Sequence, residues 1–209
     1  LTMAALADIF ADSYEPCTYM AVCKDGKMGE LQKVSFGTKV ADLVGDADVK
    51  AIAIGTKLYD ASAMDLVIEA DTQIGNGVIT VYSSKCCMIH ETEEVLLAER
   101  KQSCGKCTFC REGLIQLHTM VKEITEGQGK KEFTDMMEEI GEAMTFSTPC
   151  TMGQTASDFA MGSLKYFAGE YEDHIKKKKC ANNVCSAFMS IYIDPDLCEG
   201  CEECADVCP

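Results

Sequence analysis

Cysteines are the residues of this sequence that are most clearly suited to chemistry. The chain has 14 of them among 209 residues. Such a density indicates either a disulfide framework in a secreted protein or thiolate ligands for metal in a reducing compartment. CxxC pairs place two thiolates on one tight loop, where both reach one metal centre but are poorly placed to staple distant segments. The spacing therefore favours metal ligation and a cytoplasmic location.

The first group of cysteines lies in the run SCGKCTFCREG, which covers residues 103–113. Three thiolates converge from this loop, and a cubane cluster needs four, so a fourth should return from elsewhere. Cys150, in the loop STPCTMG, follows about forty residues later, which two antiparallel helices would consume. Unligated structural cysteines and a zinc ion are the weaker alternatives. The predicted 4Fe-4S ligands are Cys104, Cys107, Cys110 and Cys150.

The second group lies in DPDLCEGCEECADVCP, residues 194–209. This is the C-x2-C-x2-C-x3-C-P run of bacterial ferredoxins and predicts another 4Fe-4S cluster. In two-cluster ferredoxins the fourth cysteine of the run binds the other cluster, so either Cys208 closes a single cluster or a second run follows Pro209. We expect the latter, with a truncated segment here. The predicted ligands are Cys198, Cys201, Cys204 and Cys208.

Two kinds of secondary structure must position these loops. Residues 17–84 predict short strands punctuated by glycines, at 18–23, 31–34, 51–54 and 78–82. One short helix, with Thr38 as N-cap and an apolar face of Val40, Leu43 and Val44, should end at Gly45. A small sheet crossed by one helix suggests a ubiquitin-like β-grasp fold.

Residues 92–175 instead show helical periodicity, which predicts several antiparallel helices. The apolar stripes are Leu114, Leu117, Met120, Val121 and Ile124; then Phe133, Met136, Met137 and Ile140; then Leu164, Phe167, Tyr171 and Ile175. The lysine run 176–179 that follows is interpreted as a solvated hinge rather than a docking patch.

The charge of the chain limits its partners. Its formal net charge is −15, with a pI near 4.5, so nucleic acids and anionic membranes would repel it. No stretch approaches the roughly 18 apolar residues needed to span a bilayer. The sequence also contains no phosphate-binding glycine loop and no nucleophile, base and acid set, so we expect an electron relay rather than chemistry on a substrate.

The quoted cysteine run, followed by TPCTMGQTASDFAMGSLKYFAGEYEDHI, resembles the cluster-binding helical domain of a known family. This is the family of flavin-bearing, NADH-oxidising subunits of respiratory complex I, with relatives in NAD-linked hydrogenases and formate dehydrogenases. The preceding strands resemble its β-grasp (SLBB) domain, and LTMAALADIF resembles the end of its flavin domain, so the resemblance covers nearly all of residues 1–175. The family's glycine-rich FMN and NAD(H) loop lies upstream of this point. The resemblance therefore implies that FMN and NAD(H) bind only in a missing upstream domain, although a natural flavin-less paralogue remains an alternative.

Three further residues have the spacing of a zinc site. His174, Cys180 and Cys185 form a compact nitrogen and sulfur set, and one more thiolate would complete a tetrahedron. We expect Cys87 to supply it, with Cys86 as the alternative; reduced thiols near a linker are the competing interpretation. Within the family, these residues most resemble the β subunit of electron-bifurcating NAD-dependent [FeFe] hydrogenases. This resemblance implies a C-terminal ferredoxin extension and a zinc ion between the helical domain and that extension.

Together these inferences predict an α+β protein: a small β-grasp domain, an antiparallel helical bundle with a 4Fe-4S cluster, and a bacterial-ferredoxin-like segment. The expected divisions are 1–16 (end of a flavin domain), 17–90 (SLBB), 91–175 (bundle), 176–193 (linker with zinc ligands) and 194–209 (ferredoxin-type segment). The resemblance implies a subunit of an NAD(P)H-linked oxidoreductase complex that relays electrons between flavin, ferredoxin and a partner redox module. Its partners would be other iron-sulfur and flavin subunits and ferredoxin. The alternatives are a flavin-less electron-transfer scaffold, a formate dehydrogenase β subunit and a zinc-only structural module.

Overall fold

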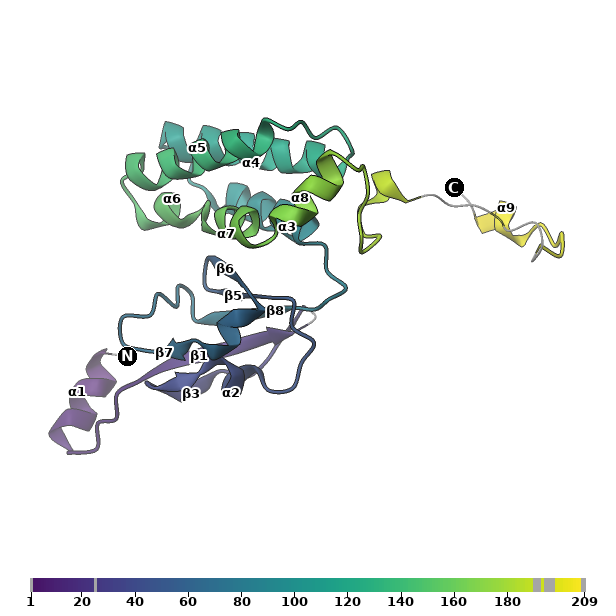
Figure 1. Cartoon of the computed structure of the whole chain (residues 1–209). Helices are drawn as coiled ribbons and strands as arrows, with labels where there is room; N and C mark the ends of the chain where they lie inside the picture. The colour runs from purple at the N-terminus through teal and green to yellow at the C-terminus, as the bar shows by residue number, and fades with distance from the viewer. Residues whose placement is uncertain (1, 25, 190–192, 194–197, 208–209) are drawn as a thin grey trace.

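The computed structural model describes residues 2–24, 26–189, 193 and 198–207. After an N-terminal helix, a small β-sheet precedes a group of helices along the chain (Figure 1). Helices α3 (Met88–Gln102) and α7 (Asp158–Tyr166) lie nearer to the sheet, and α4 (Thr108–Thr125) and α5 (Phe133–Ser147) lie on the far side of them. The structure is thus mixed α+β, as the sequence predicts.

The sheet is built around a parallel pair of strands. Strand β1 (Cys17–Lys24) runs parallel to β8 (Val78–Tyr82), with Val22 opposite Ile79. The remaining strands pair antiparallel: β2 (Lys27–Met28) and β3 (Gln32–Ser35) with β1, β5 (Ala51–Ile54) with β8, β6 (Lys57–Asp60) with β5, and β4 (Thr38–Lys39) with β7 (Val67–Ile68). Each predicted strand is present. All of β5 is buried because both of its faces are covered by other elements.

Two short helical turns and a terminal helix accompany the sheet. These are α1 (Thr2–Phe10), α2 (Val40–Val44) and the 3-10 turn η1 (Ala61–Asp65). Helix α2 ends at Gly45, which has the positive φ of 64° that favours glycine, as predicted. The predicted N-cap is wrong: Thr38 pairs with Ile68 in β4, and its hydroxyl donates to the Ser35 carbonyl instead.

The predicted bundle helices are present, with two differences from the predicted stripes. Met136 is 46% exposed, so it does not belong to the buried face of α5. Phe167 separates α7 from α8 (Ala168–Ile175), so the third stripe runs over two helices rather than one. Helix α6 (Thr151–Thr155), the 3-10 turn η2 (Ser186–Phe188) and α9 (Glu203–Val207) complete the described elements.

Close packing joins the sheet to the helices. Leu58 of the sheet, Met88 of α3 and Phe159 of α7 share one buried cluster. Gly162 allows α7 to approach β6, because a Cβ atom at this position would overlap the Leu58 carbonyl group. The bundle therefore packs directly on the sheet, and this packing positions α3. Cys87 directly precedes α3, and Cys104 lies shortly after it.

The lysine run after α8 contacts the bundle. The Lys177 ammonium lies 2.6 Å from an Asp173 carboxylate oxygen, and Lys178 donates to the carbonyls of Gly127 and Gly129 at 2.8 and 3.3 Å. Residues 176–179 are all exposed, as the solvated interpretation predicts, and two hydrogen bonds also tie the Lys178 ammonium to the turn between α4 and α5.

Candidate metal and iron-sulfur sites

The first cysteine group lines a small cavity where three helices begin or end. Cys104 follows α3, Cys107 and Cys110 lie at the start of α4, and Cys150 directly precedes α6. The cavity measures about 150 Å³ and is also lined by Gln102, Ser103 and Met152. The positive end of the α4 dipole lies at this cavity, which suits the negative charge of a thiolate-bound cluster.

No three of the four cavity cysteines, all of which lie among the described residues, form a ligand group with the close spacing of a single ion. A tetrahedral zinc with bonds of about 2.3 Å holds its sulfurs about 3.8 Å apart. Among the described residues, one group of three or more possible ligand atoms lies within 4.8 Å of one another, and it does not include these four cysteines. In a cubane each cysteine binds a different iron, so a cluster needs the wider opening. The cavity therefore fits a 4Fe-4S cluster better than zinc.

The closely spaced group is Cys87, His174, Cys180 and Cys185, and all four residues are buried. Cys87 precedes α3, His174 lies in the last turn of α8, and the other two come from the loop that leads to η2. Phe188 of η2 packs edge-on against the His174 ring, with the ring centres 5.1 Å apart. The group thus joins the start of the bundle, its last helix and the following segment.

The distances within this group match a tetrahedral ion. The sulfurs of Cys87 and Cys185 are 3.8 Å apart, and each lies 3.5 Å from Nε2 of His174. Bonds of about 2.3 Å to sulfur and about 2.05 Å to nitrogen predict separations of about 3.8 and about 3.6 Å. The ligand atom of Cys180 lies within 4.8 Å of the other three, and three sulfurs with one imidazole have the chemistry of a structural Cys₃His zinc site.

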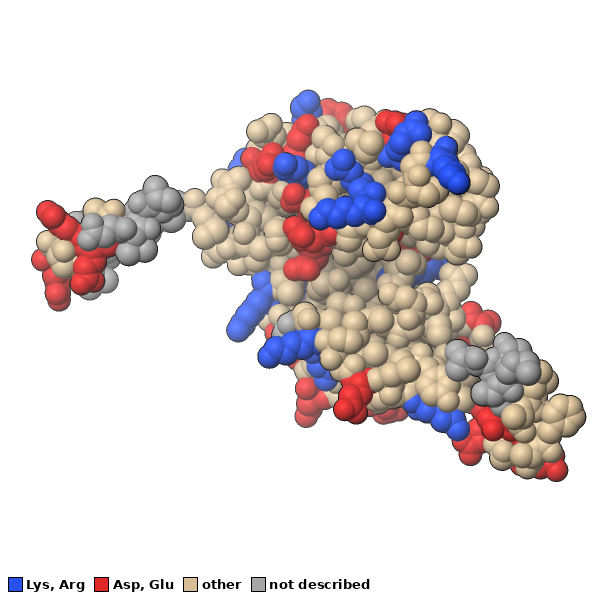
Figure 2. All heavy atoms as spheres, turned by 180° about the vertical axis from the view of Figure 1, so that it is seen from behind, with Lys and Arg blue, Asp and Glu red and all other residues tan. Residues whose placement is uncertain are grey.

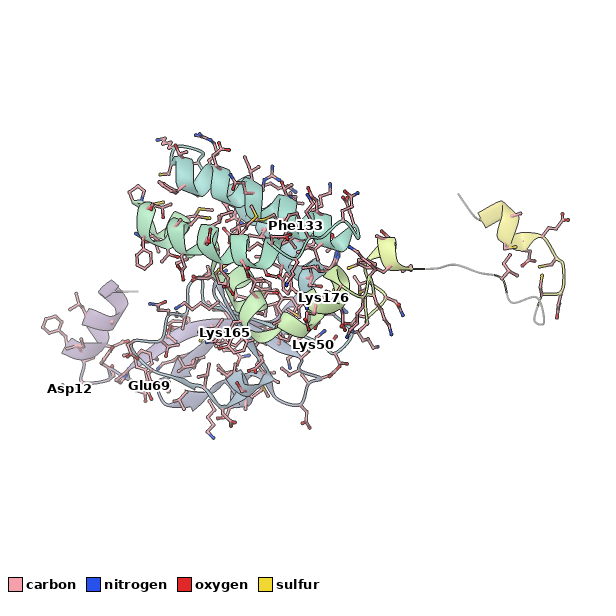
Figure 3. The ribbon with its side chains drawn as sticks, turned by 45° about the horizontal axis from the view of Figure 1, so that its top comes forward. Asp12, Lys50, Glu69, Phe133, Lys165 and Lys176 are labelled. Carbon is pink, nitrogen blue, oxygen red and sulfur yellow. The ribbon has the colours of Figure 1, made fainter. Side chains whose placement is uncertain are left out.

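The His174 ring is oriented for ligation. Its Nδ1 lies 2.8 Å from the Glu170 carbonyl oxygen, which can only accept, so Nδ1 carries a proton and Nε2 is the ring atom directed at the sulfurs. The Glu170 side chain is held in turn: one oxygen accepts from the Met88 backbone N–H at 3.0 Å and the other lies 2.7 Å from the Lys50 ammonium. Figure 3 shows Lys50 where the sheet meets the helices.

The proton equilibria of this group favour a thiolate. A hydrogen bond from Cys185, opposed by burial and supported by His174, lowers the pKa of Cys87 to about 3. The pKa of Cys185 is raised, because it shares the proton of this bond and is buried. Burial disfavours the charged imidazole, but hydrogen bonds to Cys87 and Glu170 raise the pKa of His174 to about 9. The anionic sulfur that a cation would bind is therefore already favoured.

The third cysteine group is exposed. Cys198, Cys201 and Cys204 lie in the segment that includes α9, and Cys208 lies outside the described residues. Three exposed carboxylates, Glu199, Glu202 and Glu203, accompany them, and Figure 2 shows the acidic side chains gathered over this segment. Cys198 and Cys201 lie outside helices and Cys204 lies in α9, and the described residues do not test how a cluster is closed.

Sequence reasoning missed three residues around these sites. Ser103 contacts a cavity cysteine, Glu170 orients His174, and Lys50 holds Glu170. Only Ser103 carries a local signal, because it adjoins Cys104. The predicted alternative zinc ligand, Cys86, lies instead 3.8 Å from the Ser83 hydroxyl.

Two family descriptions match the chain. Residues 91–174 match the NADH-ubiquinone oxidoreductase-F iron-sulfur binding region, and residues 191–209 match the 4Fe-4S binding domain. Both matches cover the segments that hold the predicted cluster cysteines.

Relatives with these features include proteins of redox complexes. The chain is 35% identical over 136 residues to the NADP-reducing hydrogenase subunit HndC of Solidesulfovibrio fructosivorans, covering 65% of this chain and 28% of that protein. It is 30% identical over 104 residues to the mitochondrial NADH dehydrogenase [ubiquinone] flavoprotein 1 of Dictyostelium discoideum, covering 50% of this chain and 22% of that protein. The chain thus spans about three tenths or less of the length of these two relatives.

A solved structure shares the fold. A chain of an NAD+-reducing [NiFe]-hydrogenase in the H2-reduced state superposes with a TM-score of 0.70 and 18% identity, covering 78% of this chain and 30% of that chain.

The fold and the cysteine sites define an iron-sulfur electron-transfer region. More particularly, residues 91–174 are similar to the NADH-ubiquinone oxidoreductase-F iron-sulfur binding region, as found in relatives such as HndC, and residues 191–209 are similar to a 4Fe-4S binding domain. Among the described residues, no helix is both long and apolar enough to cross a membrane.

Proposed function

We propose that this chain is the electron-transferring part of a flavin-dependent, NAD(P)H-linked oxidoreductase subunit. In this role it relays electrons between flavin, ferredoxin and a partner redox module such as an electron-bifurcating hydrogenase. The observation that carries the proposal is the cavity lined by Cys104, Cys107, Cys110 and Cys150, inside the segment that matches the oxidoreductase-F iron-sulfur region. Thiolate-ligated clusters pass single electrons, which is the chemistry that such a relay needs.

The nucleotide and flavin chemistry is assigned to the rest of a longer subunit. The matched part covers 28% of HndC, a subunit of an NADP-reducing hydrogenase. We further propose that residues 17–90 form an SLBB β-grasp domain, residues 91–175 the cluster-binding bundle, and residues 194–209 a ferredoxin-type segment. The parallel central pair β1 and β8, flanked by antiparallel strands and covered by α2, supports the β-grasp assignment.

We propose a structural zinc at Cys87, His174, Cys180 and Cys185. The close spacing of the four ligand atoms, the burial of all four residues and the hydrogen bond that orients the His174 ring support it. Such an ion would attach the segment before the ferredoxin-type residues to the bundle, because two of its ligands come from each side of that junction. Structural zinc contributes directly to folding energy, so the junction would depend on it.

The acidic residues around the third cysteine group suggest a low reduction potential for a cluster bound there. Negative charge near a cluster disfavours an added electron, so Glu199, Glu202 and Glu203 should keep a cluster at Cys198, Cys201 and Cys204 at low potential. Replacing the three glutamates by glutamine should raise its midpoint potential. An unchanged midpoint would contradict this assignment.

Anaerobic purification followed by metal, sulfide and flavin analysis tests the function. We expect iron and sulfide for at least two clusters, about one zinc per chain, and acid-released flavin only in the intact complex. Cys107→Ala should remove the iron of the first cluster but not the zinc, and His174→Ala should remove zinc but not the first cluster. A chain that binds zinc alone, with no sulfide, would contradict the electron-transfer role.

A further inference from the structure

We propose that the Ser103 hydroxyl donates a hydrogen bond to the Cys110 thiolate and thereby raises the reduction potential of the cluster held in this cavity. The inference rests on the proposed function, because it needs a cluster at these cysteines. Ser103 is not a ligand, and its role is to position a proton at one ligand sulfur.

The contact is direct. The Ser103 oxygen lies 3.4 Å from the Cys110 sulfur, within the range of hydrogen bonds to sulfur. The same oxygen accepts a hydrogen bond from the Gly105 backbone N–H at 3.3 Å. Ser103 therefore bridges the loop that carries Cys104 to the first turn of α4, which carries Cys110.

The direction of the hydrogen bond follows from proton counting. A cysteine that ligates iron is a thiolate and has no proton to give, so the Ser103 hydroxyl must be the donor. The Gly105 N–H already occupies one lone pair of the Ser103 oxygen, which leaves the hydroxyl proton free to point at the sulfur. The hydrogen bond from Gly105 is compatible with this direction, and the missing proton on the thiolate decides it.

Burial makes this hydrogen bond matter more at Cys110 than at the other ligands. Cys110 is 5% exposed, whereas Cys104 and Cys150 are exposed to solvent. Water can donate to an exposed sulfur when a protein donor is removed, but it reaches the buried sulfur poorly. The low local dielectric also strengthens the bond.

The effect on potential has a definite sign. Reduction adds negative charge that spreads onto the ligand sulfurs, so a donor to sulfur stabilises the reduced state more than the oxidised state. Removing the donor should change the ratio of reduced to oxidised cluster at a fixed potential by about three- to tenfold. For a one-electron couple this corresponds to a midpoint lower by about 30 to 60 mV.

The test is a redox titration of the full chain, followed by electron paramagnetic resonance. Cys201→Ala serves as the common background because it removes a proposed ligand of the C-terminal cluster and simplifies the signal. In this background we compare Ser103→Ala, which removes the donor, with Ser103→Thr, which keeps it. Thr108→Val is the matched control, because Thr108 lies nearby at the start of α4 and is exposed.

We expect the three- to tenfold shift in Ser103→Ala, and a midpoint close to that of the parent chain in Ser103→Thr and Thr108→Val. The midpoint does not depend on the fraction of molecules that hold a cluster, so partial loading leaves the readout valid. Ser103→Ala with an unchanged midpoint would overturn the inference. Ser103→Ala without iron, beside Ser103→Thr with full iron, would also overturn it and assign the hydroxyl to cluster assembly. A parent chain without iron and sulfide would instead refute the proposed function, independently of Ser103.

Discussion

Replacing Lys50 should weaken the packing between the sheet, the bundle and the loop that carries Cys180 and Cys185. Lys50 precedes β5, and its ammonium lies 2.7 Å from a Glu170 carboxylate oxygen on α8. It also donates to the Cys86 carbonyl at 2.6 Å and to the Asn182 side-chain oxygen at 3.2 Å. Lys50→Met keeps most of the stem of this side chain but removes all three interactions at once.

The magnitude follows from burial. The side chains of Lys50 and Glu170 are 18% and 19% exposed, so their ion pair lies between the surface and buried extremes. Surface pairs contribute about 0–1 kcal/mol, and breaking a fully buried pair costs about 3–5 kcal/mol. After the substitution, the Glu170 carboxylate keeps its hydrogen bond from Met88 but loses its cation. We therefore expect Lys50→Met to lower the free energy of unfolding by about 2–3 kcal/mol.

Urea unfolding of the full chain, followed anaerobically by circular dichroism, measures this loss. With a slope of about 2–3 kcal/mol per molar, the midpoint should fall by about 1 M. Lys33→Met is the matched control: Lys33 and Glu15 pair at a similar 2.9 Å, but their side chains are 49% and 71% exposed. The control should leave the midpoint unchanged. Equal midpoints for Lys50→Met and Lys33→Met would refute the reasoning that burial gives the Lys50 pair its weight.

Three further expectations concern packing, pH and metal. Gly162→Ala should lower the melting temperature by several degrees because its Cβ would meet sheet backbone, whereas Gly169→Ala, with open space around it, should raise stability by up to about 1 kcal/mol. Burial and the Arg100 guanidinium lower the pKa of His118 below 6.5, so the unfolded chain takes up more protons as the pH falls through this region. The free energy of unfolding should then decline on acidification below about pH 6.5, and His118→Gln should flatten this decline in urea titrations at several pH values. His174→Ala should abolish zinc retention on gel filtration with a chelator, and full zinc occupancy in that variant would rule the site out.

Local patterns predicted much of the fold. The strands and the amphipathic helices were predictable because alternation and helical periodicity record which face is buried. The cap of α2 was not, because Thr38 is a good N-cap residue by type but is taken up by pairing with β7, a contact distant in sequence. The third stripe was also misread as one helix, since Tyr171 and Leu164 pack on the same core from two helices separated at Phe167.

The sequence by itself determined the cysteine sets that lie on short loops, because ligands two or three residues apart converge on one centre in almost any fold. It also determined the acidic character of the chain and the resemblance that carries the proposed function. Only the tertiary structure decided how far apart the sulfurs lie. It places the first set around a cavity of about 150 Å³, and it brings the ligand atoms of Cys87, His174 and the loop cysteines within 4.8 Å of one another. It also brought Ser103 to Cys110 and Lys50 to Glu170, since such contacts arise from the packing of helices and sheet, which no local spacing encodes.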